Sequence, residues 1–302
     1  MLKILATDGI DKSAADALHE MGHEVVVQFY EPEDLKKALA QYDVVIVRSA
    51  TKVRAPVIDA AAEAGRLKMI IRAGVGVDNI DVEYAEHKGI KVRNTPNSSS
   101  ASVAELALAH MFSLARFVGI SNATMREGKW NKKNYTGIEL NGKTLGLVGF
   151  GRISIELAKK AHALGMKIIY TNRKGPRNEF PDFTHSSLEE LLKVSDFVSI
   201  HTPALEDGKA LIGKDELALM KKGSYIINCA RGGVVDEGAL LEALDAGHIA
   251  GAGIDVFVEE PTKNISLISH PAVSVTPHIG GSTDEAQERI GGEIVEIIKT
   301  SF

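Results

Sequence analysis

The sequence predicts an α/β protein with two doubly wound, parallel-sheet (Rossmann-like) domains and a cleft between them. Short β-branched runs alternate with Ala/Leu/Glu/Lys-rich segments of helical period along most of the chain. The runs are apolar throughout, which indicates strands buried on both faces of a parallel sheet with helices on either side. With 302 residues, 44% of them hydrophobic, the chain is long enough for two such domains.

The first series of apolar runs precedes residue 98. Helical segments separate its members, so strands and helices alternate as they do in a flavodoxin-like domain. The expected strands are KILATD, HEVVVQ, DVVIVRS, KMIIRAG and IKVRNT, at residues 3–8, 23–28, 43–49, 68–74 and 90–95.

A Pro/Asn/Ser loop then leads into one long predicted helix, residues 99–130, with Ser and Thr hydroxyls available as caps. We expect it to bridge two lobes. The second series follows, with strands at TLGLVGF, KIIYTN, DFVSIHT, SYIINCA, GAGIDVF and VSVTPH, at residues 144–150, 167–172, 196–202, 224–230, 251–257 and 273–278.

The tail has helical apolar spacing at Ile290, Ile294, Ile297 and Ile298 but no strand of its own, so it is expected to pack back on the first domain. The first domain is then discontinuous, residues 1–98 and 283–302, and the second is 99–282.

Composition narrows the possible partners to small molecules. The formal net charge is −5 and no Lys/Arg block stands out, which argues against nucleic acid. No apolar stretch approaches the roughly 20 residues that a membrane span needs. The only cysteine, Cys229, cannot form an internal disulfide, and MLKILATDG lacks the features of a secretory signal, so we expect a cytoplasmic protein.

GFGRIS, residues 149–154, predicts a nucleotide-binding turn. Gly149 and Gly151 lie between an apolar strand and a helix, where glycine permits a tight turn and backbone N–H groups can approach a pyrophosphate. Ser154 replaces the third glycine of the usual pattern but remains small. An ordinary strand-to-helix turn is the alternative.

Asn172 and Arg173 raise the question of cofactor choice. Asn172 ends the second strand of this unit, where an Asp or Glu would hold the adenosine ribose. Without that negative charge a 2′-phosphate is tolerated, and Arg173 could pair with it, so NADP is slightly favoured over NAD. Alternatively, Asn172 forms a turn and Arg173 is a solvated charge.

Arg231, Glu260 and His278 are the candidate catalytic residues, since each follows a strand of the second series. An arginine can orient a carboxylate and polarise a carbonyl, and a histidine can carry a proton near neutral pH. A carboxylate beside the imidazole stabilises the imidazolium and fixes the ring. Taken singly, each residue has an ordinary structural explanation; together they predict hydride-transfer chemistry.

INCARGGVVDEGAL, GAGIDVFVEEP and VTPHIGGST, with GFGRIS, resemble the D-isomer-specific 2-hydroxyacid dehydrogenase family nearly end to end. The resemblance implies that Arg231 binds the substrate carboxylate and carbonyl, that Glu260 tunes the histidine, and that His278 is the acid/base. It also implies a homodimer, with 99–130 as the expected interface; the alternative is that the apolar stripe of this segment is internal. The cofactor residues implied by the turn and by the resemblance are Val75, Gly149, Gly151, Arg152, Ile153, Asn172, Arg173, Thr202, Cys229, Ala230, Asp255, Gly280 and Gly281.

Within the family, VRSATKV, RAGVGVDNID, TPN and ELNGKTLG look most similar to the D-3-phosphoglycerate dehydrogenases. This implies oxidation of 3-phosphoglycerate to 3-phosphohydroxypyruvate, at the head of serine synthesis, and no regulatory C-terminal domain is expected here. The substrate residues implied are Arg48, Ser49, Lys52, Gly74 and Val75.

Two other functions remain open. A glyoxylate or hydroxypyruvate reductase would suit the Asn172-Arg173 pair, because reductive enzymes often use NADPH. A corepressor-like module that senses nucleotides would use the same fold without turnover. No metal site is predicted, because His110 and His201 lack ligand spacing and are expected to be cofactor-side or packing residues.

Overall fold

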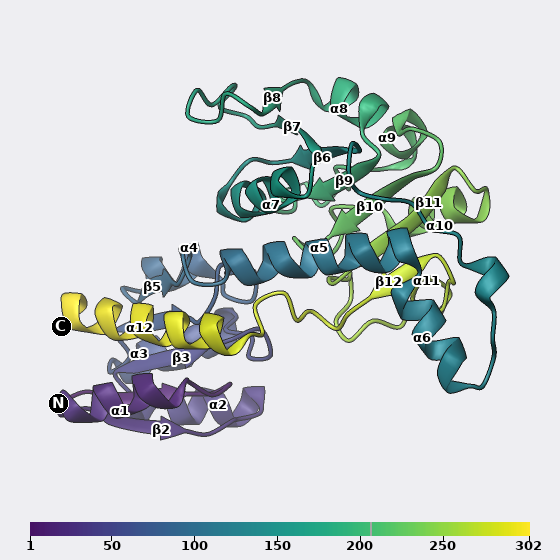
Figure 1. The fold of residues 1–302 in the computed structure, drawn as a ribbon. Coiled ribbons are helices and arrows are strands. Elements are labelled where there is room, and N and C mark those ends of the chain that lie inside the picture. Colours follow the sequence, from purple (N-terminus) through teal and green to yellow (C-terminus); the bar gives the residue numbers. More distant parts are fainter. Residues whose placement is uncertain (206) are drawn as a thin grey trace. The chain divides into compact units, whose positions relative to one another are not determined.

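The computed structural model describes residues 1–205 and 207–302, and the chain divides into two compact units. Unit 1 comprises Met1–Ser99 and Gly281–Phe302, and unit 2 comprises Ser100–Gly280. The sequence placed these boundaries at 98/99 and 282/283. Each unit contains one parallel sheet flanked by helices (Figure 1), as the fold-class prediction required.

Unit 1 has a five-stranded sheet in the order β2-β1-β3-β4-β5, the flavodoxin-like arrangement. All four pairings are parallel. The strands are β1 (Lys3–Ala6), β2 (Glu24–Val27), β3 (Val44–Val47), β4 (Met69–Arg72) and β5 (Lys91–Asn94). The helices are α1 (Lys12–Glu20), α2 (Pro32–Ala38), the 3₁₀ turn η1 (Leu39–Gln41), α3 (Ala55–Ala64), α4 (Val82–His87) and α12 (Asp284–Ser301).

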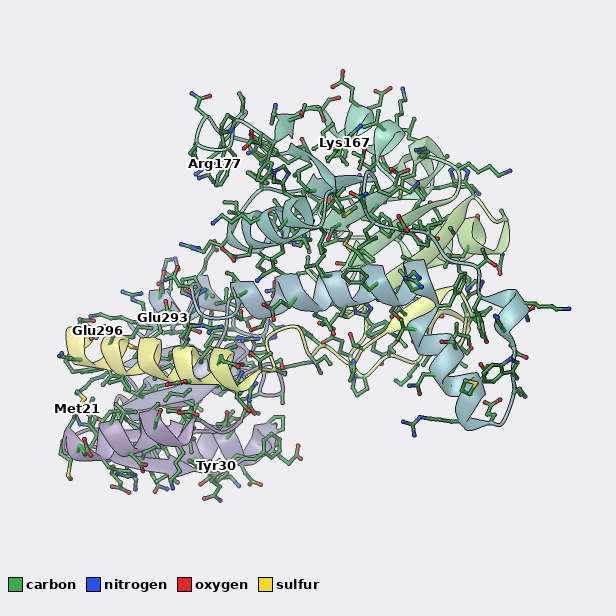
Figure 2. All side chains as sticks on the ribbon, viewed as in Figure 1. Met21, Tyr30, Lys167, Arg177, Glu293 and Glu296 are labelled. Carbon is green, nitrogen blue, oxygen red and sulfur yellow. The ribbon has the colours of Figure 1, made fainter. Side chains whose placement is uncertain are left out.

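The C-terminal helix α12 packs on the sheet of unit 1, as its apolar spacing predicted. Ile290, Ile294 and Ile298 are buried in one cluster with residues of β1, β3 and β4. Polar contacts fix the same helix, because the Glu293 carboxylate accepts hydrogen bonds from the Asn97 amide and the Ser98 hydroxyl. Glu293 and Glu296 are labelled on α12 in Figure 2. The tail therefore belongs to the first unit although 181 residues separate the two pieces.

Unit 2 has a seven-stranded sheet in the order β12-β11-β10-β9-β6-β7-β8, with the order reversing between β6 and β9. The strands are β6 (Thr144–Val148), β7 (Lys167–Thr171), β8 (Thr184–His185), β9 (Phe197–Ile200), β10 (Ser224–Asn228), β11 (Ile249–Ile254) and β12 (Val273–Val275). The helices are α5 (Ser100–Arg116), α6 (Val118–Arg126), the 3₁₀ turn η2 (Lys132–Asn134), α7 (Arg152–Ala163), α8 (Leu188–Val194), α9 (Lys214–Leu219), α10 (Glu237–Asp245) and α11 (Ile265–Ile268).

The predicted single helix 99–130 is wrong, because it is broken at Phe117. Phe117 has φ 54°, in the left-handed region, so α5 and α6 meet at an angle of 66°. The Phe117 ring packs near Tyr135, at 5.8 Å between centroids, and the Tyr135 hydroxyl contacts Thr124 of α6. Among the described residues no single helix is long and apolar enough to cross a membrane; only this bent pair meets that length and composition, and α5 is largely buried.

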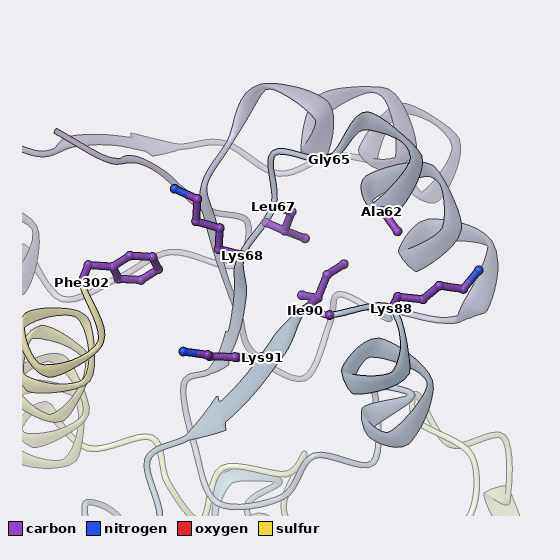
Figure 3. Close-up of a pocket in the computed structure, with 9 residues that line it drawn as sticks. Ala62, Gly65, Leu67, Lys68, Lys88, Ile90, Lys91 and Phe302 are labelled. Carbon is purple, nitrogen blue, oxygen red and sulfur yellow. The ribbon is translucent and has the colours of Figure 1, made fainter.

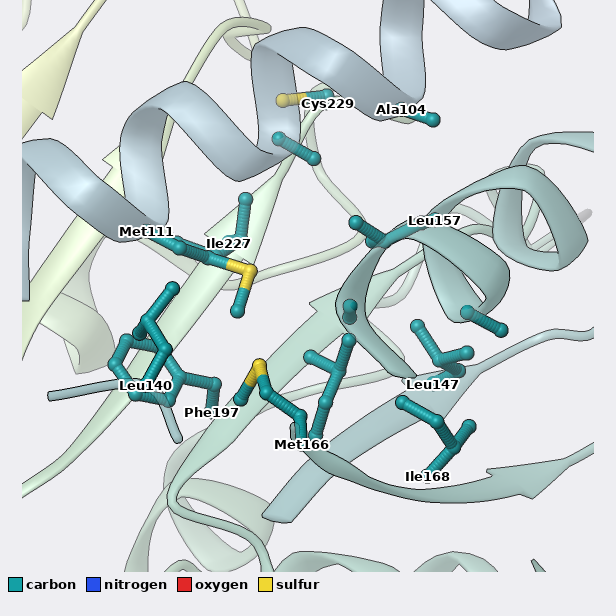
Figure 4. Packing of buried hydrophobic residues seen from close by; sticks show 14 of the residues in the cluster. Ala104, Met111, Leu140, Leu147, Leu157, Met166, Ile168, Phe197, Ile227 and Cys229 are labelled. Carbon is teal, nitrogen blue, oxygen red and sulfur yellow. The ribbon is translucent and has the colours of Figure 1, made fainter. Parts of the chain in front are cut away.

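The core of unit 2 has two parts, divided between different sets of helices. One cluster joins the sheet to α5 and α7, and Figure 4 shows Met111 of α5, Leu157 of α7 and Ile227 of β10 within it. The other cluster contains residues of α8, α9 and α10. Strands covered in this way have their polar edge only at the carboxyl ends, which is where ligands bind in open α/β sheets.

Candidate active site at the carboxyl edge of the unit 2 sheet

Three neighbouring strands of unit 2 carry the predicted catalytic residues. Arg231 follows β10, Glu260 follows β11 and His278 follows β12, and these strands pair in that order. Parallel pairing brings their carboxyl ends to one edge of the sheet. Residues separated by up to 47 positions are thereby collected at one place.

Glu260 and His278 form a hydrogen-bonded pair, 2.7 Å from Oε2 of the carboxylate to Nδ1 of the ring. The other oxygen of Glu260 accepts the backbone N–H of Phe257 at 3.1 Å. Because a carboxylate only accepts, the bond requires the hydrogen on Nδ1, which leaves Nε2 of a neutral ring as the basic nitrogen. Both side chains are 36% exposed, so a small molecule can reach them.

The environment keeps Glu260 ionised. Burial opposes the charged carboxylate, but hydrogen bonds from His278 and Phe257 and the charges of His278 and Arg231 outweigh it, so the pKa of Glu260 is lowered. Arg231 thus interacts electrostatically with the pair.

A buried asparagine shapes the turn that presents Arg231. The Asn228 amide donates to the Arg231 carbonyl at 2.9 Å, and its oxygen accepts the Ala230 N–H at 3.1 Å. The Arg231 guanidinium donates to the Ala230 carbonyl. A Cβ on Gly232 would lie 1.8 Å from the Phe257 carbonyl oxygen, so the turn after β10 fits against the chain after β11 only with glycine there.

Asp255 fixes the segment that carries His278. Its carboxylate, 1% exposed, accepts the Thr276 hydroxyl at 2.6 Å and the N–H groups of Ile279 and Gly280 at 2.8 and 2.9 Å. His278 itself has φ 53°, unusual for a residue with a side chain, and its N–H donates to the Asp255 carbonyl at 2.8 Å. Asp255 therefore holds the strained backbone of His278 through hydrogen bonds to residues before and after it in sequence.

The glycine turn leaves space and unpaired polar atoms for a ligand. Gly149 has φ 91°, and a Cβ there would lie 2.6 Å from the His201 carbonyl oxygen, whereas a Cβ on Gly151 would meet nothing within 4 Å. No side chain caps the first turn of α7, where Arg152 and Ile153 lie. His201 Nδ1 and Thr202 Oγ1, after β9, are buried without hydrogen-bond partners. These residues fit a dinucleotide phosphate and its polar neighbours.

Asn172 and Arg173 follow β7, next to the glycine turn in the sheet order. The Asn172 side-chain oxygen accepts the Lys174 N–H at 2.7 Å, the turn-forming geometry considered above, and its amide nitrogen remains for a ligand. Arg173 is exposed. The residues that directly follow β7, Asn172, Arg173 and Lys174, carry no carboxylate.

The predicted substrate residues lie in unit 1, after the neighbouring strands β3 and β4. Asp8 holds the loop of Arg48, Ser49 and Lys52 by accepting the Arg48 N–H at 2.6 Å and the Thr51 hydroxyl at 2.7 Å. Gly74 and Val75 follow β4, and the Asn94 amide donates to the Val75 carbonyl at 2.6 Å. Arg72, the last residue of β4, pairs with Val47 of β3, and its guanidinium donates to the Ala73 carbonyl at 2.6 Å and lies against Gly74.

Of the remaining predicted residues, Cys229 is buried, and burial raises the pKa of its thiol, so it is not a reactive nucleophile. Gly280 and Gly281 follow His278, in units 2 and 1 respectively. Within residues 1–205 and 207–302, no group of three His, Cys, Asp or Glu side chains is arranged to hold a metal ion.

A pocket of about 380 Å³ in unit 1 lies apart from all of these residues. Its lysines do not converge: Figure 3 shows the amino groups of Lys68 and Lys88 pointing in opposite directions. Lys88 pairs with Asp59 at 2.7 Å and Lys68 lies 4.0 Å from Asp43. These two amino groups are therefore directed toward separate carboxylates and not toward a shared ligand.

Sequence reasoning missed the residues that position others: Asn228, Asp8, Arg72 and the hydroxyl of Thr276. Asn228 carried a signal, because a buried strand that ends in Asn must satisfy the amide. The roles of Asp8 and Thr276 depend on contacts across more than 20 positions, which one sequence does not reveal.

A doubly wound sheet with a glycine turn at its switch point, and with an Arg, a Glu and a His at neighbouring strand ends, defines a nicotinamide-dependent oxidoreductase. Residues 108–280 match the model of the D-isomer specific 2-hydroxyacid dehydrogenase family, NAD binding domain. The chain belongs to the D-isomer-specific 2-hydroxyacid dehydrogenase family, as the sequence resemblance indicated.

Three similar proteins span nearly the whole chain. The present chain is 47% identical over 300 residues to a hydroxypyruvate reductase of Thermotoga maritima, and the match covers 98% of this chain and 97% of that protein. It is 44% identical over 302 residues to a D-3-phosphoglycerate dehydrogenase of Methanocaldococcus jannaschii, covering 99% of this chain but 57% of that protein. The crystal structure of a glyoxylate reductase from Paecilomyes thermophila matches with TM-score 0.89 and 30% identity, over 99% and 95% of the two chains.

His201 predicts a pH dependence of stability. Burial lowers the pKa of His201 to about 4 from the ordinary 6.5, so the unfolded chain takes up this proton at a higher pH than the folded chain. The His201 contribution to stability is complete above pH 6.5, falls as the pH drops toward 4, and is constant below that. Urea unfolding of the wild type and of His201→Gln should give a steeper loss for the wild type in this window; parallel curves would contradict it.

Proposed function

We propose that this protein transfers a hydride between a nicotinamide cofactor and a small D-2-hydroxy acid, with 3-phosphoglycerate and 3-phosphohydroxypyruvate as the first candidate pair. The observation that carries the proposal is the Glu260–His278 pair, whose geometry leaves Nε2 basic and accessible beside Arg231. A binding module without turnover has no need of that arrangement.

Each catalytic residue has a separate task in the proposed reaction. Arg231 binds the substrate carboxylate by charge-assisted hydrogen bonds and polarises the carbonyl in the reductive direction. His278 Nε2 takes the hydroxyl proton during oxidation, and the imidazolium returns it during reduction. Glu260 holds the ring through Nδ1 and stabilises the imidazolium. The nicotinamide, when bound, accepts or supplies the hydride.

Gly149, Gly151 and the first turn of α7 would hold the cofactor pyrophosphate, and Thr202 and His201 offer polar atoms beside it. NADP is slightly favoured over NAD. Asn172 puts no negative charge against a 2′-phosphate, and the exposed Arg173 is available to pair with one.

For the substrate, Arg48 and Lys52 suit a phosphate, and Arg72 adds a third cation to the same edge of unit 1. The second candidate is hydroxypyruvate or glyoxylate, which lack the phosphate. It is supported by the match to a hydroxypyruvate reductase, which extends over nearly the full length of both chains.

Initial rates of reduction with 3-phosphohydroxypyruvate, hydroxypyruvate and glyoxylate, each with NADH and NADPH, test the proposal. The phosphorylated substrate should have the highest kcat/KM. Arg48→Gln should lower that value by about 10- to 150-fold, because one charge-assisted hydrogen bond to phosphate contributes roughly 1.5–3 kcal/mol, and should leave hydroxypyruvate reduction nearly unchanged.

Two other results of these rate measurements would contradict the proposal. Reduction of hydroxypyruvate without reduction of the phosphorylated substrate would select the second candidate. No turnover of any 2-keto acid by the folded protein would reject the enzyme reading.

We also propose that the protein forms a homodimer through residues 99–130. Helix α6 has no buried residue, and Val118 and Met125 on it are 54% and 50% exposed. Light scattering should give a mass near twice the 32.4 kDa of one chain, and Met125→Asp should lower it. A single-chain mass for the wild type would contradict the dimer.

A further inference from the structure

His110 is a buried imidazole that the proposed reaction does not use. It lies on α5, is 2% exposed, and faces β11 at Gly253. A Cβ on Gly253 would lie 2.6 Å from the Cβ of His110, so α5 can approach β11 this closely only over a glycine. The close approach brings the His110 ring to two hydroxyls of the segment that begins with β12.

Four side chains form a hydrogen-bonded chain from α5 to the segment of His278. His110 Nδ1 lies 2.9 Å from the Ser274 hydroxyl, and its Nε2 lies 3.1 Å from the Thr276 hydroxyl. Thr276 in turn donates to Asp255 at 2.6 Å. Asp255 accepts the N–H groups of Ile279 and Gly280, on the C-terminal side of His278.

The Asp255 carboxylate, which can only accept, determines which atom donates in the hydrogen bonds of Thr276 and His110. Thr276 has one hydroxyl hydrogen, which goes to Asp255, so it can only accept from His110. His110 must then carry its hydrogen on Nε2, and its Nδ1 is left as an acceptor 2.9 Å from the Ser274 hydroxyl, which also lies 3.3 Å from the Ser113 hydroxyl and can donate to either. Every donor in this chain has an acceptor, as a buried polar network requires.

We propose that His110 is a positioning residue: as the Nε2–H donor to Thr276, it orients the Thr276–Asp255 pair and so fixes the catalytic segment 276–280. This role rests on the proposed function for its effect on turnover. Its effect on the segment does not depend on that function.

Burial supports the neutral form of His110 in this role. Burial lowers the pKa of its imidazole, and the nearby charge of Asp255 opposes the shift without cancelling it. The ring therefore has one donor and one acceptor nitrogen, which the chain uses in opposite directions.

Two substitutions of His110 distinguish the effect of losing the Nε2–H donor from the effect of losing the imidazole ring. The amide nitrogen of Gln can reach the place of Nε2 and donate to Thr276, whereas the shorter Asn reaches only the place of Nδ1. His110→Gln should keep kcat within about twofold of wild type, and His110→Asn should lower kcat about tenfold with a smaller change in KM, since small misplacements of a catalytic group cost 10- to 100-fold.

Thr276→Val completes a double-mutant cycle. If His110 acts through Thr276, His110→Asn should have little further effect on kcat in the Thr276→Val background. Leu114→Ala is the matched control. Leu114 is one turn along the same face of α5 and lies against a β11 glycine, Gly251, but takes no part in the hydrogen bonds between His110 and Asp255. It should lower stability and leave kcat unchanged at a temperature where it is folded.

Amide hydrogen exchange gives a readout that needs no turnover. The N–H groups of Ile279 and Gly280 should exchange about tenfold faster in His110→Asn than in wild type or His110→Gln. Equal protection in all three proteins, equal kcat for the Gln and Asn variants, or additive effects in the cycle would overturn the proposal. If the wild type shows no turnover but the exchange rates differ as expected, the proposed function is rejected and the positioning role of His110 is kept.

Discussion

The candidate active site at the carboxyl edge of the unit 2 sheet depends on one buried carboxylate, that of Asp255. Its two oxygens accept the Thr276 hydroxyl and the N–H groups of Ile279 and Gly280, and its carbonyl accepts the N–H of His278. These bonds hold His278 in a backbone conformation that few residues with a side chain adopt. Because Asp255 directly follows β11, the position of the imidazole is set by the sheet.

The same sheet explains how residues far apart in sequence come to act together. Each of β10, β11 and β12 ends at the same edge, and the segments that follow them carry Arg231, Glu260 and His278 respectively. Glycines at 232 and 253 let the backbone and α5 pack closely enough for these ends to be held by side-chain hydrogen bonds. The chemistry follows from parallel pairing together with close packing.

Much of the fold was predictable because its strands are apolar throughout and separated by helical segments. β8 was missed because a two-residue strand, Thr184–His185, leaves no periodic signal. The break at Phe117 was missed because helical periodicity continues across it and the left-handed residue is not a glycine. Tertiary contacts of Phe117 and Tyr135, rather than local propensity, accompany that break.

The candidate site was predictable to the level of residue type and strand end. Glu260 and His278 were expected to meet, and they do, at 2.7 Å. Other hydrogen-bond partners were not predictable: His110, expected to be a packing or cofactor-side residue, joins Thr276 and Ser274. Such choices depend on side-chain orientation across distant segments.

Glu260 fixes the proton of His278 on Nδ1 and leaves Nε2 basic. Nitrogen-15 NMR of the neutral imidazole of His278 measures this directly. The account predicts a protonated Nδ1 and a bare Nε2 in the wild type, with the preference weakened in Glu260→Ala. A wild-type ring that carries its proton on Nε2 would contradict the account.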